Sequence, residues 1–215
     1  MTEPDVALTD YALSIECALF AAILYFRGDR SLPSWRWFIL FFASLSLATF
    51  AGGTVHGLFL EGDPSAHRAL AALGLVSGGL AALAAWGLGA ALRLSAAAAR
   101  LVVTFATGEF FLYCALVLFV VPDLSLALAN YAVPAVFLAL VFHSLYRHMK
   151  VRELRLGTAG LLLTLLAAAG QQKGIALGPP RLDPNAVYHA LQAVALLMVF
   201  LAARWLLRRR AGGLF

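Results

Sequence analysis

The last long apolar segment of the chain opens with the run Asp183-Pro184-Asn185-Ala186-Val187-Tyr188-His189-Ala190-Leu191-Gln192. This is the most polar run inside any apolar segment of the sequence. Asn185, His189 and Gln192 are spaced i, i+4 and i+7, so on a helix they share one face. Groups that ionise or hydrogen-bond are costly in lipid, so this face is expected to point into the protein. The stretch therefore predicts a membrane-spanning helix with a buried polar stripe.

The rest of the chain has the composition of a membrane protein. It has 215 residues, of which 62% are hydrophobic and only 13% are charged, whereas about a quarter of the residues of a soluble domain are charged. A membrane span needs about 20 apolar residues. By this measure the sequence predicts spans at residues 10–26, 35–60, 67–92, 96–121, 124–148, 156–177 and 185–207. The expected fold is all-α, a single seven-helix transmembrane domain covering residues 1–215.

Loop charges predict the orientation of this bundle. The loops after the first, third and fifth spans, together with the C-terminal end, carry most of the arginines and lysines. The opposite loops carry most of the acidic residues. By the positive-inside rule the N-terminus is expected outside and the C-terminus in the cytoplasm. An odd number of spans agrees with this orientation.

The same features argue against several classes of protein. No basic surface interleaved with aromatic residues is long enough for nucleic acid. Cys17 and Cys114 both lie inside apolar segments, which argues against a disulfide framework and against thiolate metal sites. A retinal protein needs a Schiff-base lysine in the seventh span, which has none. The nearly apolar inner half argues against an ion pathway.

A second histidine extends the site beyond the last span. His56 follows Gly52-Gly53-Thr54-Val55 near the outer end of the second span, and the predicted topology places it at a depth similar to that of His189. Glu16 is expected about two turns below the outer surface on the first span. Residues expected at this level are Glu16, His56, Asn130, Gln171, Gln172, Asn185, His189 and Gln192. The sequence therefore predicts a polar pocket in the outer half of the bundle.

Two interpretations of this pocket follow from its residue types. His56 and His189 are candidate ligands of a zinc ion, with Glu16 as the third ligand, and zinc with an open position activates water for hydrolysis. Alternatively, the histidines form interhelical hydrogen bonds that fix packing. Glu16 is alternatively a protonated acid or the partner of a histidine in an ion pair. Asn185 and Gln192 fit hydrogen-bond partners better than ligands, whereas Glu109 has no evident partner.

The two histidine elements resemble those of the CREST superfamily, which includes alkaline ceramidases, progestin and adipoQ receptors, and Per1 proteins. Gly52-Gly53-Thr54-Val55-His56 is similar to its second-span element, and Asn185-Ala186-Val187-Tyr188-His189 to its seventh-span element, with asparagine in place of the first histidine. The resemblance is closer to an uncharacterised bacterial seven-span branch, through the Gly-Gly-x-x-His-Gly and Asn-x-x-x-His-x-x-Gln patterns. It implies a seven-helix fold, a Zn²⁺ site and a location in the bacterial cytoplasmic membrane.

From these observations we expect a membrane-embedded, metal-dependent hydrolase of a lipid or another amphiphile. His56 and His189 would bind the metal, with Glu16 or Asp63 as a further ligand or general base. The residues expected to line the pocket or to support the ligands are Thr54, Asn130, Gln171, Gln172, Asn185, Tyr188 and Gln192. The alternative is a non-catalytic seven-helix protein that binds or senses a lipid or small molecule in the same pocket, with a basic face toward anionic lipid or a partner.

Overall fold

The computed structural model describes residues 3–59, 64–120, 124–175 and 183–209. Within these ranges every regular element is helical. The elements are α1 (Pro4–Arg27), α2 (Pro33–Thr54), η1 (Val55–Phe59), α3 (Pro64–Arg93), α4 (Ala96–Phe119), α5 (Leu124–Met149), α6 (Arg152–Gln172) and α7 (Pro184–Arg209). η1 is a π-helical turn that continues α2. Seven helices in the described residues are long and apolar enough to cross a membrane, which confirms the predicted seven-helix architecture.

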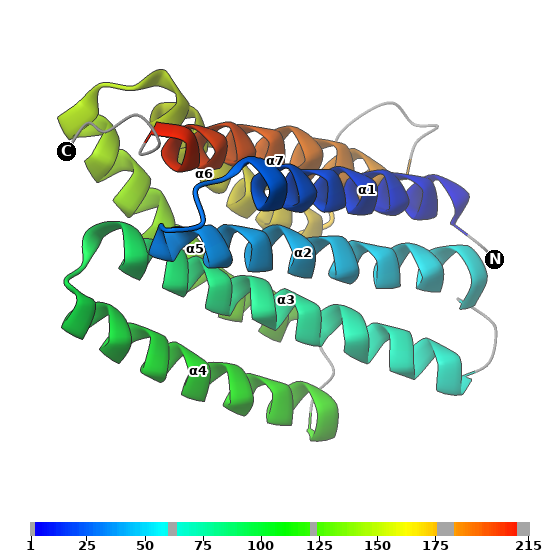
Figure 1. Ribbon diagram of the computed structural model, residues 1–215. Coiled ribbons are helices and arrows are strands. Elements are labelled where there is room, and N and C mark those ends of the chain that lie inside the picture. Colours follow the sequence, from blue (N-terminus) through cyan, green and yellow to red (C-terminus); the bar gives the residue numbers. More distant parts are fainter. Residues whose placement is uncertain (1–2, 60–63, 121–123, 176–182, 210–215) are drawn as a thin grey trace.

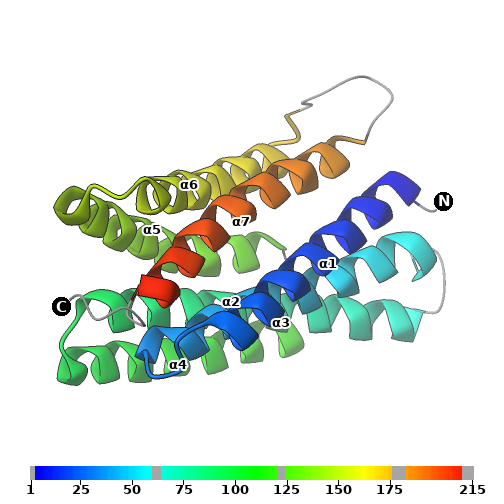
Figure 2. The same cartoon turned by 45° about the horizontal axis from the view of Figure 1, so that its top comes forward.

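Six of the helices form a closed ring. α1 packs against α2, α2 against α3, α3 against α5, α5 against α6, α6 against α7, and α7 against α1. α4 packs on the outside of α3 and lies at the edge of the bundle (Figure 1). In Figure 2, α5, α6 and α7 separate from α1, α2 and α3, so the ring is closed by the α3–α5 and α1–α7 contacts. α3 therefore contacts three other helices, α2, α4 and α5.

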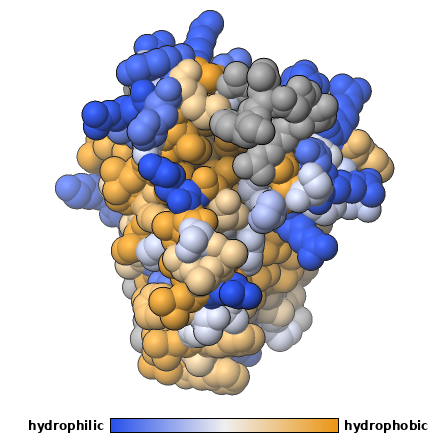
Figure 3. All heavy atoms as spheres, turned by 60° about the vertical axis from the view of Figure 1, so that its left-hand side comes forward, coloured by the Kyte–Doolittle hydropathy of each residue, from blue (hydrophilic) through white to orange (hydrophobic). Residues whose placement is uncertain are grey.

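The surface has the distribution expected of a protein that spans a bilayer. Large apolar side chains such as Phe26, Leu101, Phe105, Phe111 and Phe119 are exposed along the helices. Basic residues lie at the end of the bundle where α1, α3, α5 and α7 finish, which we call the C-terminal end. Figure 3 shows hydrophilic residues over its upper part and hydrophobic residues over the lower part, at the level of α4. The charge asymmetry that predicts the orientation is thus present between the two ends.

Two helices differ in length from their predicted spans, and each difference has a local cause. α1 begins at Pro4 rather than near residue 10, because proline suits the first helical position and Asp5 is stabilised by the helix dipole there. α6 ends at Gln172 rather than at residue 177. Gly174 has φ +62°, and the amide of Ile175 donates to the carbonyl of Gly170, an arrangement that terminates a helix. The early start of α1 places Thr9 inside the helix and Glu3 immediately before it.

The small residues of α3 have two different roles. A Cβ atom on Gly79, Gly87 or Gly89 would lie 2.6, 2.3 or 2.3 Å from the rings of Tyr113, Trp37 or Phe137, respectively. These glycines therefore accept aromatic rings from neighbouring helices rather than helix backbones. In contrast, a Cβ on Gly78 would meet nothing within 4 Å. The space beside Gly78 is therefore open, whereas the space beside Gly79, Gly87 and Gly89 is filled by aromatic rings.

The half of the ring toward the C-terminal end is closely packed. Phe20 of α1 stacks on Phe200 of α7 with ring centroids 4.1 Å apart, and Phe42 of α2 packs edge-on against both rings. Phe38 and Phe142 are completely buried in the same core. This half of the bundle is dry and apolar, in agreement with the nearly apolar inner half that the sequence predicts.

α4 is held to α3 by two polar contacts. The indole nitrogen of Trp86 donates to Glu109 Oε2 at 3.0 Å, and the Tyr113 hydroxyl donates to the carbonyl of Leu75 at 3.0 Å. Glu109 has no partner that the sequence reveals, and the structure supplies one. A polar side chain at the edge of the bundle is thereby satisfied without water.

Helix contact at Gly160 is predicted to be less tolerant than the open position Gly108. A Cβ on Gly160 of α6 would lie 2.5 Å from the backbone carbonyl oxygen of Ala195, whereas one on Gly108 of α4 would meet nothing within 4 Å. Gly160→Ala should destabilise the protein by about 1–3 kcal/mol through overpacking. Gly108→Ala should be neutral or stabilising, since alanine is the better helix former. Thermal unfolding of the purified protein in detergent tests this contrast, and equal melting temperatures would contradict it.

Candidate functional site

Two acids at the start of the chain pair with two histidines from different helices. Glu3 immediately precedes α1, and Asp10 lies within that helix. Glu3 contacts His56 of η1, and Asp10 contacts His189 of α7. Because α1 lies between α2 and α7 in the ring, the two pairs join three elements at the end where α1 begins, which we call the N-terminal end. The two histidines expected at one level do lie in one region.

The pair between Glu3 and His56 is the closer one. Glu3 Oε2 lies 2.7 Å from His56 Nδ1, and the Glu3 amide donates to the His56 carbonyl at 3.2 Å. That carbonyl belongs to the last turn of η1, where carbonyls have no intrahelical donor. His56 itself sits in a π-helical turn, a distortion that is often found at functional sites. Because Glu3 engages Nδ1, Nε2 is the nitrogen that can face a ligand.

The second pair is longer and involves a hydroxyl. His189 Nδ1 lies 3.2 Å from Thr9 Oγ1 and 3.5 Å from Asp10 Oδ1. Thr9 directs its own proton to the carbonyls of Asp5 and Val6, both at 2.9 Å. The hydroxyl oxygen is therefore the acceptor, which puts a proton on Nδ1 of His189. Asp10 Oδ1 is farther from Nδ1 than Thr9 Oγ1 is, so Asp10 accepts at most part of this hydrogen bond. Asp10 is nevertheless only 4% exposed.

Two glycines allow Asp10 to lie against α2. A Cβ on Gly52 would lie 3.0 Å from Asp10 Oδ2, and a Cβ on Gly53 would lie 3.0 Å from Asp10 Cβ and 3.2 Å from the carbonyl oxygen of Ala7. A side chain at either position would push α1 away from α2. The Gly-Gly step before His56 thus provides a close approach between α1 and α2. It also brings a buried carboxylate beside the histidine elements.

Asp10 is the site residue that the sequence analysis missed. From the sequence it belongs to the acidic residues that gather at the predicted outer side. A signal was present, because Asp10 is followed by Leu13, Ser14 and Cys17 at helical spacing, and all four are buried on one face of α1. Reading that face would have placed Asp10 in the interior.

A cavity of about 450 Å³ lies inside the ring beside this cluster. This volume is within the range of about 300–1,000 Å³ found for small-molecule pockets. The residues that line it are Asp10, Leu45, Ala48, Thr49, Gly52, Val55, His56, Leu70, Ala71, Gly74, Leu75, Gly78, Ala127, Leu128, Tyr131, Thr164, Gln192 and Leu196. Most of the lining is aliphatic, and a few polar groups enter it from five of the helices and η1.

The polar groups of the cavity mostly present acceptor atoms. Gln192 Oε1 is buried and has no hydrogen-bond partner among the described residues. Thr49 directs its hydroxyl proton to the carbonyls of Leu45 and Ser46, so its oxygen can act only as an acceptor, and Thr164 directs its own proton to Leu161. The lining as a whole is therefore apolar, with several hydrogen-bond acceptors, the hydroxyl of Tyr131, the amide of Gln192 and one buried carboxylate.

Other predicted pocket residues hold the helix ends together instead. Gln171 of α6 donates to Asn185 Oδ1 at 3.2 Å, and the Tyr188 hydroxyl donates to the Ile175 carbonyl. Gln172 donates to Ser125 at 2.8 Å, and Thr54 accepts from the Tyr11 hydroxyl at 3.1 Å. Asn130 is not among the cavity lining residues, although its neighbour Tyr131 is. The predicted polar layer therefore divides into structural ties and a cavity lining.

The predicted ligand set of His56, His189 and Glu16 does not come together. The described residues contain no group of three or more His, Cys, Asp or Glu side chains placed to hold a metal ion. Glu16 is six residues beyond Asp10, so it points about 120° away around α1, and its Oε2 atom is buried without a partner in the described structure. Each histidine instead has its own carboxylate. These residues do not fit a zinc centre, and Asp63 lies outside the described residues.

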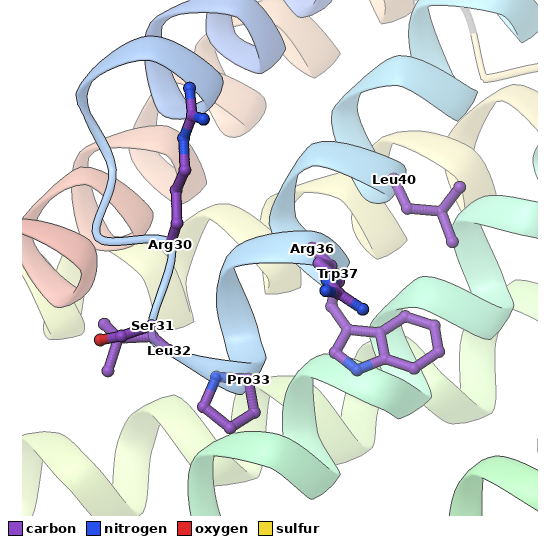
Figure 4. Close-up of a pocket in the computed structure, with 7 residues that line it drawn as sticks. All are labelled: Arg30, Ser31, Leu32, Pro33, Arg36, Trp37 and Leu40. Carbon is purple, nitrogen blue, oxygen red and sulfur yellow. The ribbon is translucent and has the colours of Figure 1, made fainter.

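A second cavity, of about 520 Å³, lies at the opposite end of the bundle. It is lined by Arg30, Ser31, Leu32, Pro33, Arg36, Trp37 and Leu40. In Figure 4, Arg30 extends from the α1–α2 connection away from Trp37, and its guanidinium carbon lies 4.9 Å and 5.6 Å from the ring centroids of Tyr25 and Trp35. Arg30 is therefore already engaged by two rings. This hollow is a basic, interfacial surface and not a second polar pocket.

Comparison with known proteins gives the chain a family but no activity. No curated protein and no solved structure matches it. Residues 6–208 match a family described as a family of unknown function, DUF6962. The match includes Asp10, both histidines and every cavity residue. The chain belongs to the DUF6962 family.

Proposed function

We propose that this protein binds a single-chain amphiphile in the cavity inside its helical ring. One observation carries the proposal: a cavity of about 450 Å³ has aliphatic walls and a small group of buried polar atoms. Aliphatic side chains suit a hydrocarbon chain, whereas Asp10, Gln192 and Thr49 suit a small head group. Gln192 Oε1 is buried without a hydrogen-bond partner in the described structure, and a bound head group would supply one.

In this proposal the protein binds or senses an amphiphile in the cytoplasmic membrane. We place the basic end of the bundle in the cytoplasm, by the positive-inside rule, so that the cavity lies in the outer half of the bilayer. The resemblance to a bacterial seven-span branch supports a bacterial cytoplasmic membrane. In this orientation an amphiphile of the outer leaflet would reach the cavity without crossing the membrane.

Hydrolysis of the bound amphiphile is the second candidate function, and a specific contact favours it. His56 lines the cavity, and Glu3 holds its Nδ1 atom at 2.7 Å. A carboxylate that orients a histidine in this way is a common element of general acid–base catalysis. The zinc-dependent form of this reaction, which the CREST resemblance implies, needs a ligand set other than His56, His189 and Glu16.

Filling the cavity should abolish binding of the amphiphile. Gly78→Leu places a side chain in open space within the cavity lining, whereas Gly108→Leu places the same side chain in open space on α4. Native mass spectrometry of the detergent-purified protein with added 1-lauroyl glycerol measures the bound adduct. We expect at least about a tenfold loss of the adduct in Gly78→Leu, because overpacking excludes the chain. Gly108→Leu should bind like the wild type, and equal adduct in both variants would refute the proposal.

Binding and hydrolysis make different predictions for the same preparation. A binding protein should retain 1-lauroyl glycerol after chelation with EDTA and should release no glycerol over hours. For a binding protein, elemental analysis should find no stoichiometric zinc. A metal-dependent hydrolase would instead contain zinc that is lost in both His56→Ala and His189→Ala. Glycerol release that disappears in His56→Gln would instead establish the hydrolase.

A further inference from the structure

We propose that the cavity selects amphiphiles whose head group is a protonated amine, with the ammonium group at Asp10. This inference rests on the proposed function, since it assigns the chemistry of the head group that the cavity takes. It starts from the mismatch between the charge of Asp10 and the few donors around it. The ligand then supplies the donors that the protein lacks.

Asp10 has little compensation for its burial. Asp10 is 4% exposed, and its closest polar partner is His189 Nδ1 at 3.5 Å from Oδ1. That distance is too long for a good hydrogen bond, and the same nitrogen is closer to Thr9, at 3.2 Å. On the other side, Oδ2 faces the Cα of Gly52, which donates no strong hydrogen bond. A buried carboxylate in this position requires a cation or a proton.

The rest of the cavity reinforces the demand for donors. Gln192 Oε1 has no hydrogen-bond partner in the described structure, and the Thr49 hydroxyl donates its proton to backbone carbonyls. The cavity lining contains no lysine or arginine. The charge of His56, when it is protonated, is balanced by Glu3 at 2.7 Å. A positively charged head group is therefore complementary to this lining, whereas a carboxylate or phosphate would be repelled by Asp10.

An alkylammonium ion matches the cavity at both ends. It carries three N–H donors, the lining offers acceptors on Asp10, Gln192 and Thr49, and hydrogen bonds between ions are about twice as strong as neutral ones. Its hydrocarbon chain would lie against the aliphatic walls formed by Leu45, Leu70, Leu75, Leu128 and Leu196. A primary alcohol of the same length offers one donor and no charge, so it should bind more weakly.

Head-group selection can be measured with three ligands of equal chain length. Dodecylamine, dodecanol and dodecanoate are added at pH 7 to the detergent-purified protein, and the bound adducts are quantified by native mass spectrometry. We expect the amine to bind at least about tenfold more tightly than the other two. Asp10→Asn should remove this preference. Glu109→Gln, which neutralises an acid that lies on α4 and outside the cavity lining, should preserve it.

A second variant covers the case in which Asp10→Asn does not fold. Gln192→Met removes the unpartnered acceptor with little change in volume and should weaken dodecylamine binding several-fold more than dodecanol binding. Equal binding of the three ligands, or an amine preference that survives in Asp10→Asn or Gln192→Met, would overturn the ammonium assignment. Such results leave the proposed function intact as long as 1-lauroyl glycerol binding is sensitive to Gly78→Leu. Loss of that sensitivity would overturn both proposals.

Discussion

The close contact between Asp10 and the Gly52-Gly53 step is the constraint on which the rest of the site depends. With no side chain at either glycine, α1 approaches α2 until a Cβ at either position would lie 3.0 Å from the aspartate side chain. This approach brings Thr9 and Asp10 within reach of His189 on α7, and Glu3 within reach of His56 on η1. Since lipid provides no hydrogen bonds, each of these polar groups must find its partner inside the bundle. One small pair of residues thereby organises three elements.

The two halves of the ring satisfy this demand differently. Toward the C-terminal end, Phe20, Phe42 and Phe200 fill the interior with stacked and edge-on aromatic rings. Toward the N-terminal end, small residues such as Gly74 and Gly78 leave a cavity, and buried acceptors face it. A packed half provides rigidity, and an unpacked half provides a place for a ligand. This division is the physical basis for considering the protein a receptor for a small amphiphile.

Much of the fold could be predicted because each helix carries its own signal. Apolar runs of membrane-spanning length indicate helices. The basic loops predict which end of the bundle faces the cytoplasm. The π-helical turn around His56 could not be predicted, because it depends on how α2 ends against α1 and α3. The sequence predicts a layer of polar residues, but it does not show which of them tie helices together and which line the cavity. Gln171, Asn185 and Tyr188 tie α6 to α7, whereas Gln192, one turn deeper than Tyr188, faces the cavity.

The sequence by itself determined seven helices, their boundaries to within a few residues, and a concentration of histidines and amides toward one end. These follow from hydropathy and spacing, which act along a single helix. Only the tertiary structure decided that Asp10, and not Glu16, meets His189, and that each histidine has a carboxylate of its own. The reason is the packing of α1 against α2. The spacing of Asp10, Leu13, Ser14 and Cys17 indicates which face of α1 is buried, but the partner that each acid meets depends on how closely the glycines of α2 let α1 approach.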